Sequence, residues 1–163
     1  MTHIGAGQIA PSFSLTTPDG KVLSLADALE GHPAVLAFFK VTCPVCQFTF
    51  PFLERLHRIH GQNAFVLAIS QDDPRDTRDF MNEYKLTFPA VVDGEGFPVS
   101  SAYGLTNVPT IFLIDSDGRV VVSSVGFVRA DLENIFERLG KRSQLPPAAL
   151  FHLDEVIPSY KPG

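Results

Sequence analysis

A run of apolar residues from Val35 to Phe39 is followed, after three further residues, by the motif Cys43-Pro44-Val45-Cys46. A continuous apolar run of this length predicts a central strand that is covered on both faces. The residues after the motif have helical periodicity, and Pro44 suits the first position of a helix because its missing N–H needs no partner there. We therefore expect both cysteines at the start of a helix that directly follows a buried strand.

These two residues are the only cysteines in the chain. The start of a helix offers free N–H groups and the positive end of the helix dipole, and both favour a thiolate. A pair this closely spaced closes too small a loop for a useful structural cross-link, which favours catalysis or metal binding. We expect Cys43 to be the more exposed nucleophile. Cys46, one turn deeper, is expected to be buried and to resolve a mixed disulfide.

Predicted strands and helices alternate along the rest of the chain. An N-terminal hairpin surrounds the turn Pro18-Asp19-Gly20, and Ser24 can cap a short helix after it. The order that follows is β-α-β-α-β-α-β-β-α, with strands at 35–39, 64–69, 90–92, 110–114 and 120–125 and helices at 44–60, 73–84, 98–103 and 130–139. Alternating units predict a parallel sheet core, and the last two strands add an antiparallel hairpin. Within the first long helix, one stripe is expected to face the core, formed by Phe48, Phe52, Leu56 and Ile59.

Length and composition exclude several classes of protein. The chain has 163 residues, of which 45% are hydrophobic and 19% charged, so a single folded domain is expected and disorder is not. Its net charge of -5 and the lack of a basic cluster argue against nucleic-acid binding. No apolar run approaches the roughly 20 residues needed to span a bilayer. No signal peptide is visible at Met1, which predicts a cytoplasmic protein, or an extracytoplasmic one if a leader has been removed.

A second motif, Val108-Pro109-Thr110, stands directly before a strand that ends in Asp115. Together with the dithiol, with Ala10-Pro11-Ser12-Phe13 and with Pro51, it resembles the thioredoxin-like redoxin (AhpC/TSA-type) superfamily, and within it the thiol-disulfide oxidoreductases of the TlpA/ResA type. The resemblance covers residues 8 to 140. It implies a three-layer α/β/α sandwich with a mixed central sheet, extended by the N-terminal hairpin and followed by a Pro-rich tail.

The same resemblance implies a substrate groove. Pro109 is expected to follow a cis peptide bond and to bring the backbone of Val108 beside the dithiol, where it receives an extended substrate peptide. Substrate contacts are expected from Thr42, Pro44, Val45, Val108 and Pro109. The implied partners are a protein disulfide or dithiol and a thiol reductant or oxidant. No metal and no organic cofactor is expected.

Two positions depart from this family. Thr42 stands where the family has Trp before the first cysteine, and the chain contains no Trp. Ala37 stands where thioredoxin has a buried Asp that accepts the proton of the second cysteine. Asp72 and Asp73, at the end of the next predicted strand, are the candidates to replace it.

Three other interpretations of the dithiol stand beside this one. A thiol peroxidase of the peroxiredoxin type is the main alternative, although its Pro-x-x-x-Thr/Ser-x-x-Cys signature fits neither cysteine. A zinc site with His57 and His60 is disfavoured, because a helix of about 1.5 Å per residue carries His57 far from Cys46. A non-catalytic docking module is the third class, and it would use the tail as its interaction element.

Residues 1–142 are expected to form the redoxin domain and residues 143–163 a C-terminal tail. The tail combines several prolines with the apolar residues Leu150, Phe151, Leu153, Val156 and Ile157. A solvated segment would be less apolar, so we expect the tail to pack on the domain or on a second copy of the chain, which would make a homodimer.

Overall fold

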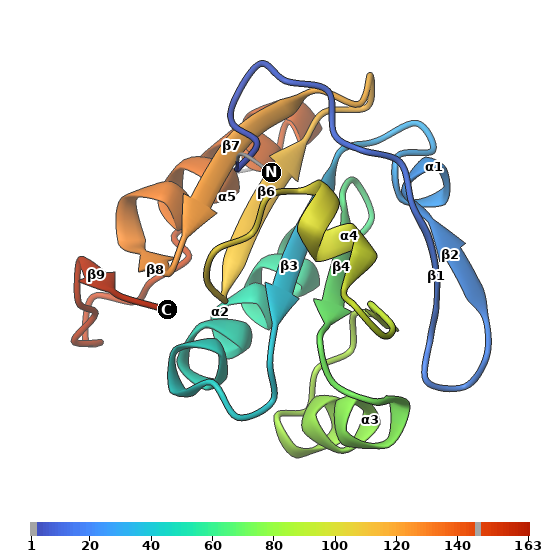
Figure 1. Ribbon diagram of the computed structural model, residues 1–163. Coiled ribbons are helices and arrows are strands. Elements are labelled where there is room, and N and C mark those ends of the chain that lie inside the picture. Colours follow the sequence, from blue (N-terminus) through green and yellow to red (C-terminus); the bar gives the residue numbers. More distant parts are fainter. Residues whose placement is uncertain (1–2, 146–147) are drawn as a thin grey trace.

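The computed structural model describes residues 3–145 and 148–163, and a seven-stranded mixed sheet forms its centre (Figure 1). The strand order is β2-β1-β5-β4-β3-β6-β7, with bounds β1 Ser14–Thr16, β2 Val22–Ser24, β3 Ala34–Phe39, β4 Phe65–Ser70, β5 Ala90–Val92, β6 Thr110–Ile114 and β7 Val120–Val125. Strands β3, β4 and β5 are parallel, whereas β1, β6 and β7 run antiparallel to their neighbours. The expected parallel core, the antiparallel hairpin at β6–β7 and the N-terminal hairpin are all confirmed.

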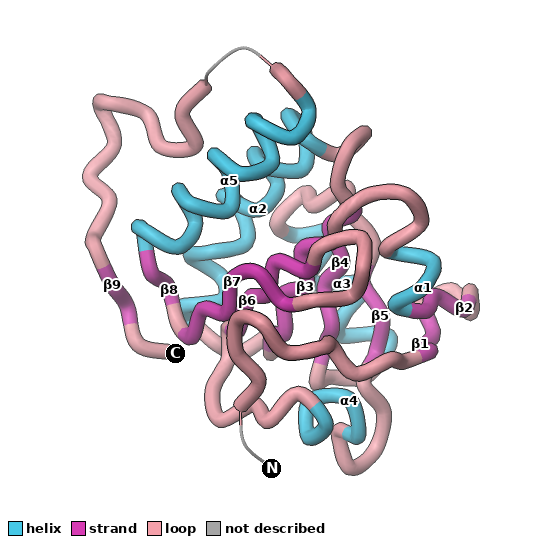
Figure 2. Tube along the Cα trace, turned by 90° about the horizontal axis from the view of Figure 1, so that it is seen from above, coloured by secondary structure: helices cyan, strands magenta, loops and turns pink. Residues whose placement is uncertain are grey.

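Helices cover both faces of this sheet, which confirms the three-layer architecture (Figure 2). Their bounds are α1 Leu25–Ala28, α2 Pro44–His60, α3 Pro74–Glu83, α4 Pro98–Ala102 and α5 Arg129–Ser143. Side chains of α2, α3 and α5 pack on one face, and those of α1, α4 and the N-terminal segment pack on the other.

Strand β3 is buried along its whole length, as its composition predicts. Val35, Ala37 and Phe39 contribute to the cluster under α2 and α5, whereas Leu36 and Phe38 contribute to the cluster on the opposite face. Each of these side chains is 0% exposed. Burying a large apolar side chain stabilises the fold by about 1.5–3 kcal/mol, so the strand that leads into the dithiol is rigidly held.

The starts of the shorter helices follow the expected capping chemistry. Ser24 and Asp27 form a reciprocal capping box at α1, in which Asp27 N–H donates to Ser24 Oγ at 3.1 Å and Ser24 N–H donates to Asp27 Oδ2 at 2.9 Å. Asp73 caps α3 by accepting the N–H of Asp76 at 2.8 Å, with Pro74 in the first turn. Local sequence therefore sets these boundaries.

Two expectations about the longer helices were wrong. Helix α5 does not end at Gly140 but continues to Ser143, and Gln144 takes the left-handed conformation that closes it. Gly140 lies inside α5 beside α2, where a Cβ would stand 3.7 Å from Cε1 of His60, an ordinary van der Waals distance. Ile59 is 42% exposed and does not belong to the core stripe, because at this end of α2 the ring of His60 packs on Phe136 instead.

The tail returns along α2 and α5 and adds a short strand pair to the domain. Strand β9 (Tyr160–Lys161) pairs antiparallel with β8 (Phe127–Val128), and Figures 1 and 2 both show the two strands side by side. Phe151 is buried, and its ring centroid lies 5.0 Å from that of Phe52 on α2. The boundary at residue 142 and a homodimer through the tail stay predictions.

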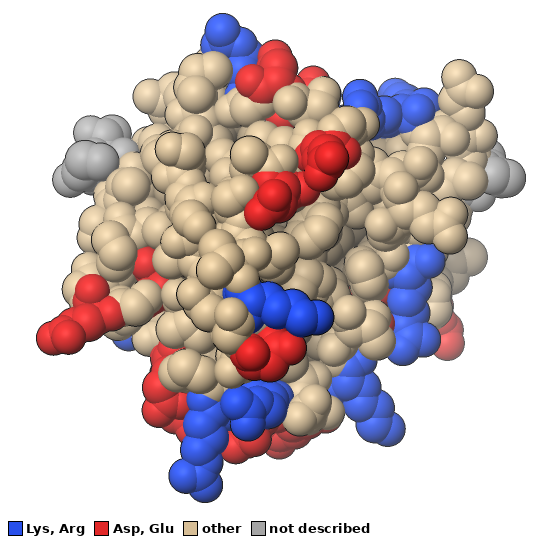
Figure 3. Space-filling model, turned by 90° about the vertical axis from the view of Figure 1, so that its right-hand side faces the viewer, with Lys and Arg blue, Asp and Glu red and all other residues tan. Residues whose placement is uncertain are grey.

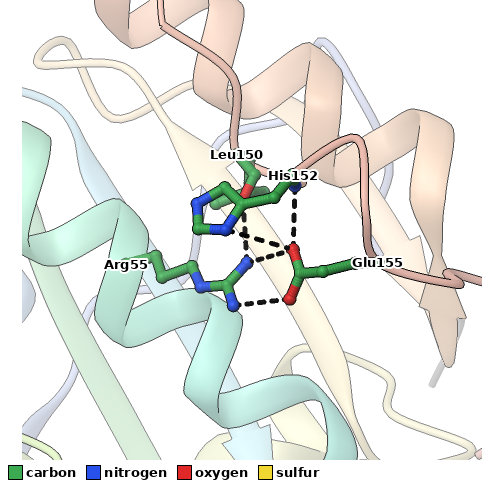
Figure 4. A network of polar contacts seen from close by, with 4 residues as sticks. All are labelled: Arg55, Leu150, His152 and Glu155. Carbon is green, nitrogen blue, oxygen red and sulfur yellow. Dashed lines mark hydrogen bonds and ion pairs between the residues drawn. The ribbon is translucent and has the colours of Figure 1, made fainter.

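An ion pair also anchors the tail to α2 (Figure 4). Arg55 donates to both carboxylate oxygens of Glu155 at 2.6 Å and to the carbonyl of Leu150 at 3.3 Å. The N–H of His152 donates to the same carboxylate at 2.8 Å. A bidentate pair of this kind fixes geometry as well as adding energy.

The surface carries charges of both signs. Figure 3 shows Lys and Arg side chains interspersed with Asp and Glu on the face that lies to the right in Figure 1, where the β1–β2 hairpin stands. Within the described ranges, no helix has the length and apolar character needed to cross a membrane.

Candidate active site

The two cysteines lie where a buried strand passes into a helix. Strand β3 ends at Phe39, α2 begins at Pro44, and Cys43 occupies the N-cap between them with an extended backbone. The N–H of Cys46 donates to Cys43 Sγ at 3.2 Å. A hydrogen-bond donor and the positive end of the α2 dipole therefore both point at this sulfur.

The thiols differ sharply in their environments. Cys43 is half-buried, whereas Cys46 is 0% exposed, and both are free thiols. Burial raises the pKa of Cys46 far above its usual value, and the side chain of Cys43 and the negative charge of Asp72 raise it further. Of the two sulfur atoms, Cys43 is thus the one that an incoming disulfide can reach, while Cys46 is held as a neutral thiol behind it.

The Val108–Pro109 loop lies directly against the dithiol. The peptide bond before Pro109 is cis, as expected, and the thiol of Cys43 donates to the Val108 carbonyl at 3.5 Å. The loop reaches this place because it leads into β6, whose first residue Thr110 pairs with Phe38 near the end of β3. Sheet register therefore brings two segments that are far apart in the sequence to the same point.

The other expected substrate contacts surround the first cysteine. Thr42 and Pro44 are exposed, Val45 and Val108 are half-buried, and Pro109 is buried. The exposed residues flank Cys43 in the chain, so they stand at the open side of the dithiol. Contact with a substrate stays a prediction for all five residues.

Two polar side chains hold the loop that precedes the dithiol. Asp72 Oδ2 accepts the N–H of Val41 at 2.7 Å, and Gln47 Nε2 donates to the carbonyl of Val41 at 2.9 Å. Asp72 follows β4, and it comes close to Cys46 because β4 runs parallel to β3. Asp73 points away from the site and caps α3 instead. Of the two candidate carboxylates, Asp72 is the one whose charge acts on the pKa of Cys46, whereas Asp73 caps α3.

Sequence reasoning missed two elements of this site. No sequence motif marks Gln47 as a donor to the Val41 carbonyl, because a polar residue in the first turns of a helix can also simply face solvent. The approach of the tail to the Val108 loop was also missed: Asn107 donates from its side-chain amide to an oxygen of Gly163 at 3.4 Å. The apolar composition of the tail predicted that it packs on the domain or on a second copy, but not where its end would lie.

The histidines of α2 lie apart from the thiols. His57 stacks edge-on against Phe88, with 5.8 Å between ring centroids, and His60 packs against Phe136. Burial lowers the pKa of His60. In the part of the chain that the structure covers, no three His, Cys, Asp or Glu side chains are grouped as metal ligands.

Comparison with known proteins agrees with this geometry. The model of the AhpC/TSA family matches residues 6–123. Thiol-disulfide oxidoreductase ResA of Bacillus anthracis is 33% identical over 122 residues, which cover 74% of this chain and 69% of that protein. ResA of Halalkalibacterium halodurans is 32% identical over 138 residues, or 83% and 77% of the two chains.

Solved structures place the fold in the same group. A putative thiol:disulfide interchange protein DsbE from Chlorobium tepidum superposes with a TM-score of 0.74 at 28% identity, covering 87% of this chain and 99% of that one. Peroxidoxin BcpB of Mycobacterium tuberculosis has a TM-score of 0.75 at 22% identity over 85% and 98% of the two chains, a likeness of fold alone. The family match over most of the sequence, and relatives whose names state this activity, identify the protein as a thioredoxin-like member of the AhpC/TSA family and a thiol-disulfide oxidoreductase.

Proposed function

We propose that Cys43 attacks the disulfide of a protein or low-molecular-weight partner and that Cys46 resolves the resulting mixed disulfide. The observation that carries this assignment is the contrast between the two thiols. Cys43 is half-buried at the helix start with an N–H aimed at its sulfur, whereas Cys46 is fully buried with a raised pKa. A nucleophile must be reached by its target, and a resolving thiol needs only to reach its neighbour.

The exchange takes place in two steps. The thiolate of Cys43 attacks one substrate sulfur, a bond forms between these two sulfurs, and the other substrate sulfur leaves as a thiolate. Cys46 then loses its proton and attacks Cys43 Sγ, which releases the second substrate thiolate. The substrate disulfide is reduced by two electrons, and the Cys43–Cys46 pair is oxidised to a disulfide. An external dithiol restores the starting state by the reverse sequence.

Asp72 supports the second step in this proposal. Its charge raises the pKa of Cys46, and its Oδ2 accepts the N–H of Val41 in the loop before the dithiol, so we assign the uptake of the departing proton, directly or through water, to this carboxylate. It takes the place of the buried Asp that thioredoxin has at the position of Ala37. Thr42, Pro44, Val45, Val108 and Pro109 are proposed to contact the substrate around the reacting sulfurs.

Trapping of the mixed disulfide tests the two roles. Cys46→Ser leaves the attacking thiol intact and removes the resolving one, so it is expected to accumulate a covalent adduct with a disulfide protein such as insulin. Cys43→Ser is the matched control, because it retains one cysteine and is expected to form no adduct. The adduct is measured by non-reducing electrophoresis and intact mass.

Two results would contradict the proposal. Adducts with Cys43→Ser and none with Cys46→Ser would reverse the roles. Rapid turnover of hydrogen peroxide by the reduced wild-type protein, with no mixed disulfide from either variant, would favour the peroxidase class instead.

A further inference from the structure

The end of the tail lies on the main chain of Val108, at the carbonyl that also contacts Cys43. A Cβ atom on Gly163 would overlap the Val108 carbonyl oxygen and would lie 2.8 Å from its carbon, so backbone touches backbone here. The same carbonyl accepts the Cys43 thiol at 3.5 Å. Gly163 is therefore separated from the reacting sulfur by one carbonyl group.

Contacts along residues 160–163 hold this end in place. Lys161 pairs with Phe127 in the β8–β9 ladder, and its ammonium group lies 5.0 Å from the ring centroid of Phe48, two residues after Cys46 on α2. Gly126, at a φ of +77°, allows the close approach, since a Cβ there would lie 2.6 Å from the carbonyl oxygen of Lys161. The tail thus meets both sides of the site, the helix that carries the dithiol and the cis-proline loop.

A protein disulfide needs the space that this segment fills. In a disulfide the two Cα atoms are about 4.4–6.8 Å apart, so a mixed disulfide on Cys43 draws the partner's main chain to within that distance. An extended partner chain at this distance must run beside the protein main chain nearest to the Cys43 sulfur, which is that of Val108. Gly163 already lies against that main chain. A small disulfide has no continuing chain and meets no such obstacle.

We propose that residues 160–163 form a specificity element that admits small disulfides to Cys43 and must be displaced by an extended protein disulfide. This inference rests on the proposed attack by Cys43. Because Cys43 stays half-exposed with the tail in place, exchange with a low-molecular-weight disulfide needs no rearrangement. Only molecules whose tail is undocked react with a protein disulfide, so the rate of this reaction is proportional to the undocked fraction.

Lys161→Pro in the full chain tests the inference. Proline cannot donate to the β8–β9 ladder, and the change also removes the cation over Phe48, so the end of the tail is expected to detach. If a tenth of the wild-type molecules have the tail open, kcat/KM for insulin rises by roughly tenfold, and the rate with oxidised glutathione stays within about twofold. Hydrogen exchange of residues 157–163 reports whether the tail is released.

Two further variants distinguish detachment of the tail from disruption of the fold. Lys161→Ala removes the cation but keeps the backbone donor, so it is expected to give a smaller rise for insulin. Leu153→Pro introduces the same residue at a fully exposed tail position and is expected to leave both substrates unchanged. Oxidised glutathione also verifies the dithiol, because a misfolded variant loses this activity as well.

The outcomes separate this inference from the proposed function. Equal gains for insulin and glutathione, or an unchanged ratio of the two rates despite faster exchange of residues 157–163, would overturn the specificity element and leave Cys43 as nucleophile. Unchanged exchange of the tail in Lys161→Pro would also overturn it, since the ladder would then not hold the segment. Absence of any mixed disulfide with Cys46→Ser would contradict the proposed function itself, the attack of Cys43 on a substrate disulfide.

Discussion

The carboxylate of Asp72 accepts the main-chain N–H of Val41 at 2.7 Å, which fixes a negative charge near the buried thiol of Cys46. This charge is one cause of the raised pKa of Cys46, after burial and the side chain of Cys43. Asp72→Asn removes the charge but keeps an oxygen that can accept from Val41. The pKa of Cys46 is therefore expected to fall, because a neutral neighbour no longer disfavours the thiolate.

The measurement is the pH dependence of alkylation at Cys46 in a Cys43→Ser background. Relative to that background, the midpoint is expected at lower pH in Asp72→Asn. Asp73→Asn is the matched control, because Asn caps a helix as well as Asp and this side chain faces α3. A midpoint that moves equally in both variants, or rises in Asp72→Asn, would contradict the conclusion that the charge of Asp72 raises the pKa of Cys46.

The difference in accessibility between the thiols predicts their relative reactivity. At neutral pH the reduced wild-type protein is expected to be alkylated at Cys43 at least about tenfold faster than at Cys46, because the Cys46 sulfur is both enclosed and protonated. Timed iodoacetamide labelling followed by peptide mass spectrometry measures both rates in one sample. Equal labelling of the two peptides at early times is incompatible with the proposed roles.

The ion pair that anchors the tail predicts a pH-dependent contribution to stability. Arg55, followed by the N–H of His152, lowers the pKa of Glu155 from 4.5 to about 2. A carboxylate whose pKa falls on folding stabilises the folded state fully above its unfolded pKa, and loses that contribution as the pH falls through its folded pKa. The contribution of Glu155 is thus present above pH 4.5 and disappears toward pH 2.

Thermal unfolding of the wild-type protein and Glu155→Gln tests this sign. The difference in melting temperature is expected to be constant around neutral pH and to shrink below pH 4.5. Glu137→Gln is the control, because its pair with Lys141 is well exposed on α5 and such pairs contribute little. A difference that grows on acidification would mean that Glu155 does not act through its charge.

A buried carboxylate links the far end of α2 to the segment before β5. Glu54 is 7% exposed and accepts from the N–H of Thr87 at 2.8 Å, the hydroxyl of Thr87 at 2.7 Å and the guanidinium of Arg58 at 2.9 Å. Glu54→Ala leaves the Thr87 donors without this acceptor. Thr87 itself is exposed, so water can replace the lost acceptor, and the expected cost is the net contribution of a hydrogen bond, about 0.5–1.5 kcal/mol.

Denaturant unfolding measures this cost as a lower midpoint with an unchanged slope. Thr87→Val is a useful companion, because it removes the hydroxyl partner and keeps the side chain's shape. Stability within about 0.5 kcal/mol of wild type for Glu54→Ala, the range of ordinary surface changes, would show that the network contributes nothing.

Several features of this protein follow from local sequence alone. The apolar run before Cys43, Pro44 at the first helical position and the caps at Ser24 and Asp73 each act within a few residues, and the structure has the elements they predict. The two motifs, read with a family resemblance, also predicted the cis bond before Pro109. Helix α5 was predicted too short, because Gly140 suggested a helix end by its residue type alone, whereas the left-handed residue that closes the helix is Gln144.

The amino-acid sequence by itself determined the dithiol, its place at a helix start and the alternation of strands and helices, because capping and apolar periodicity are short-range effects. Tertiary structure alone decided that Asp72 rather than Asp73 approaches Cys46 and that Gly163 lies on Val108. The physical reason is sheet register. Residues far apart in the sequence are brought together by the parallel pairing of β3 with β4 and the antiparallel pairing of β8 with β9. Their distance in space cannot be inferred from their separation along the chain.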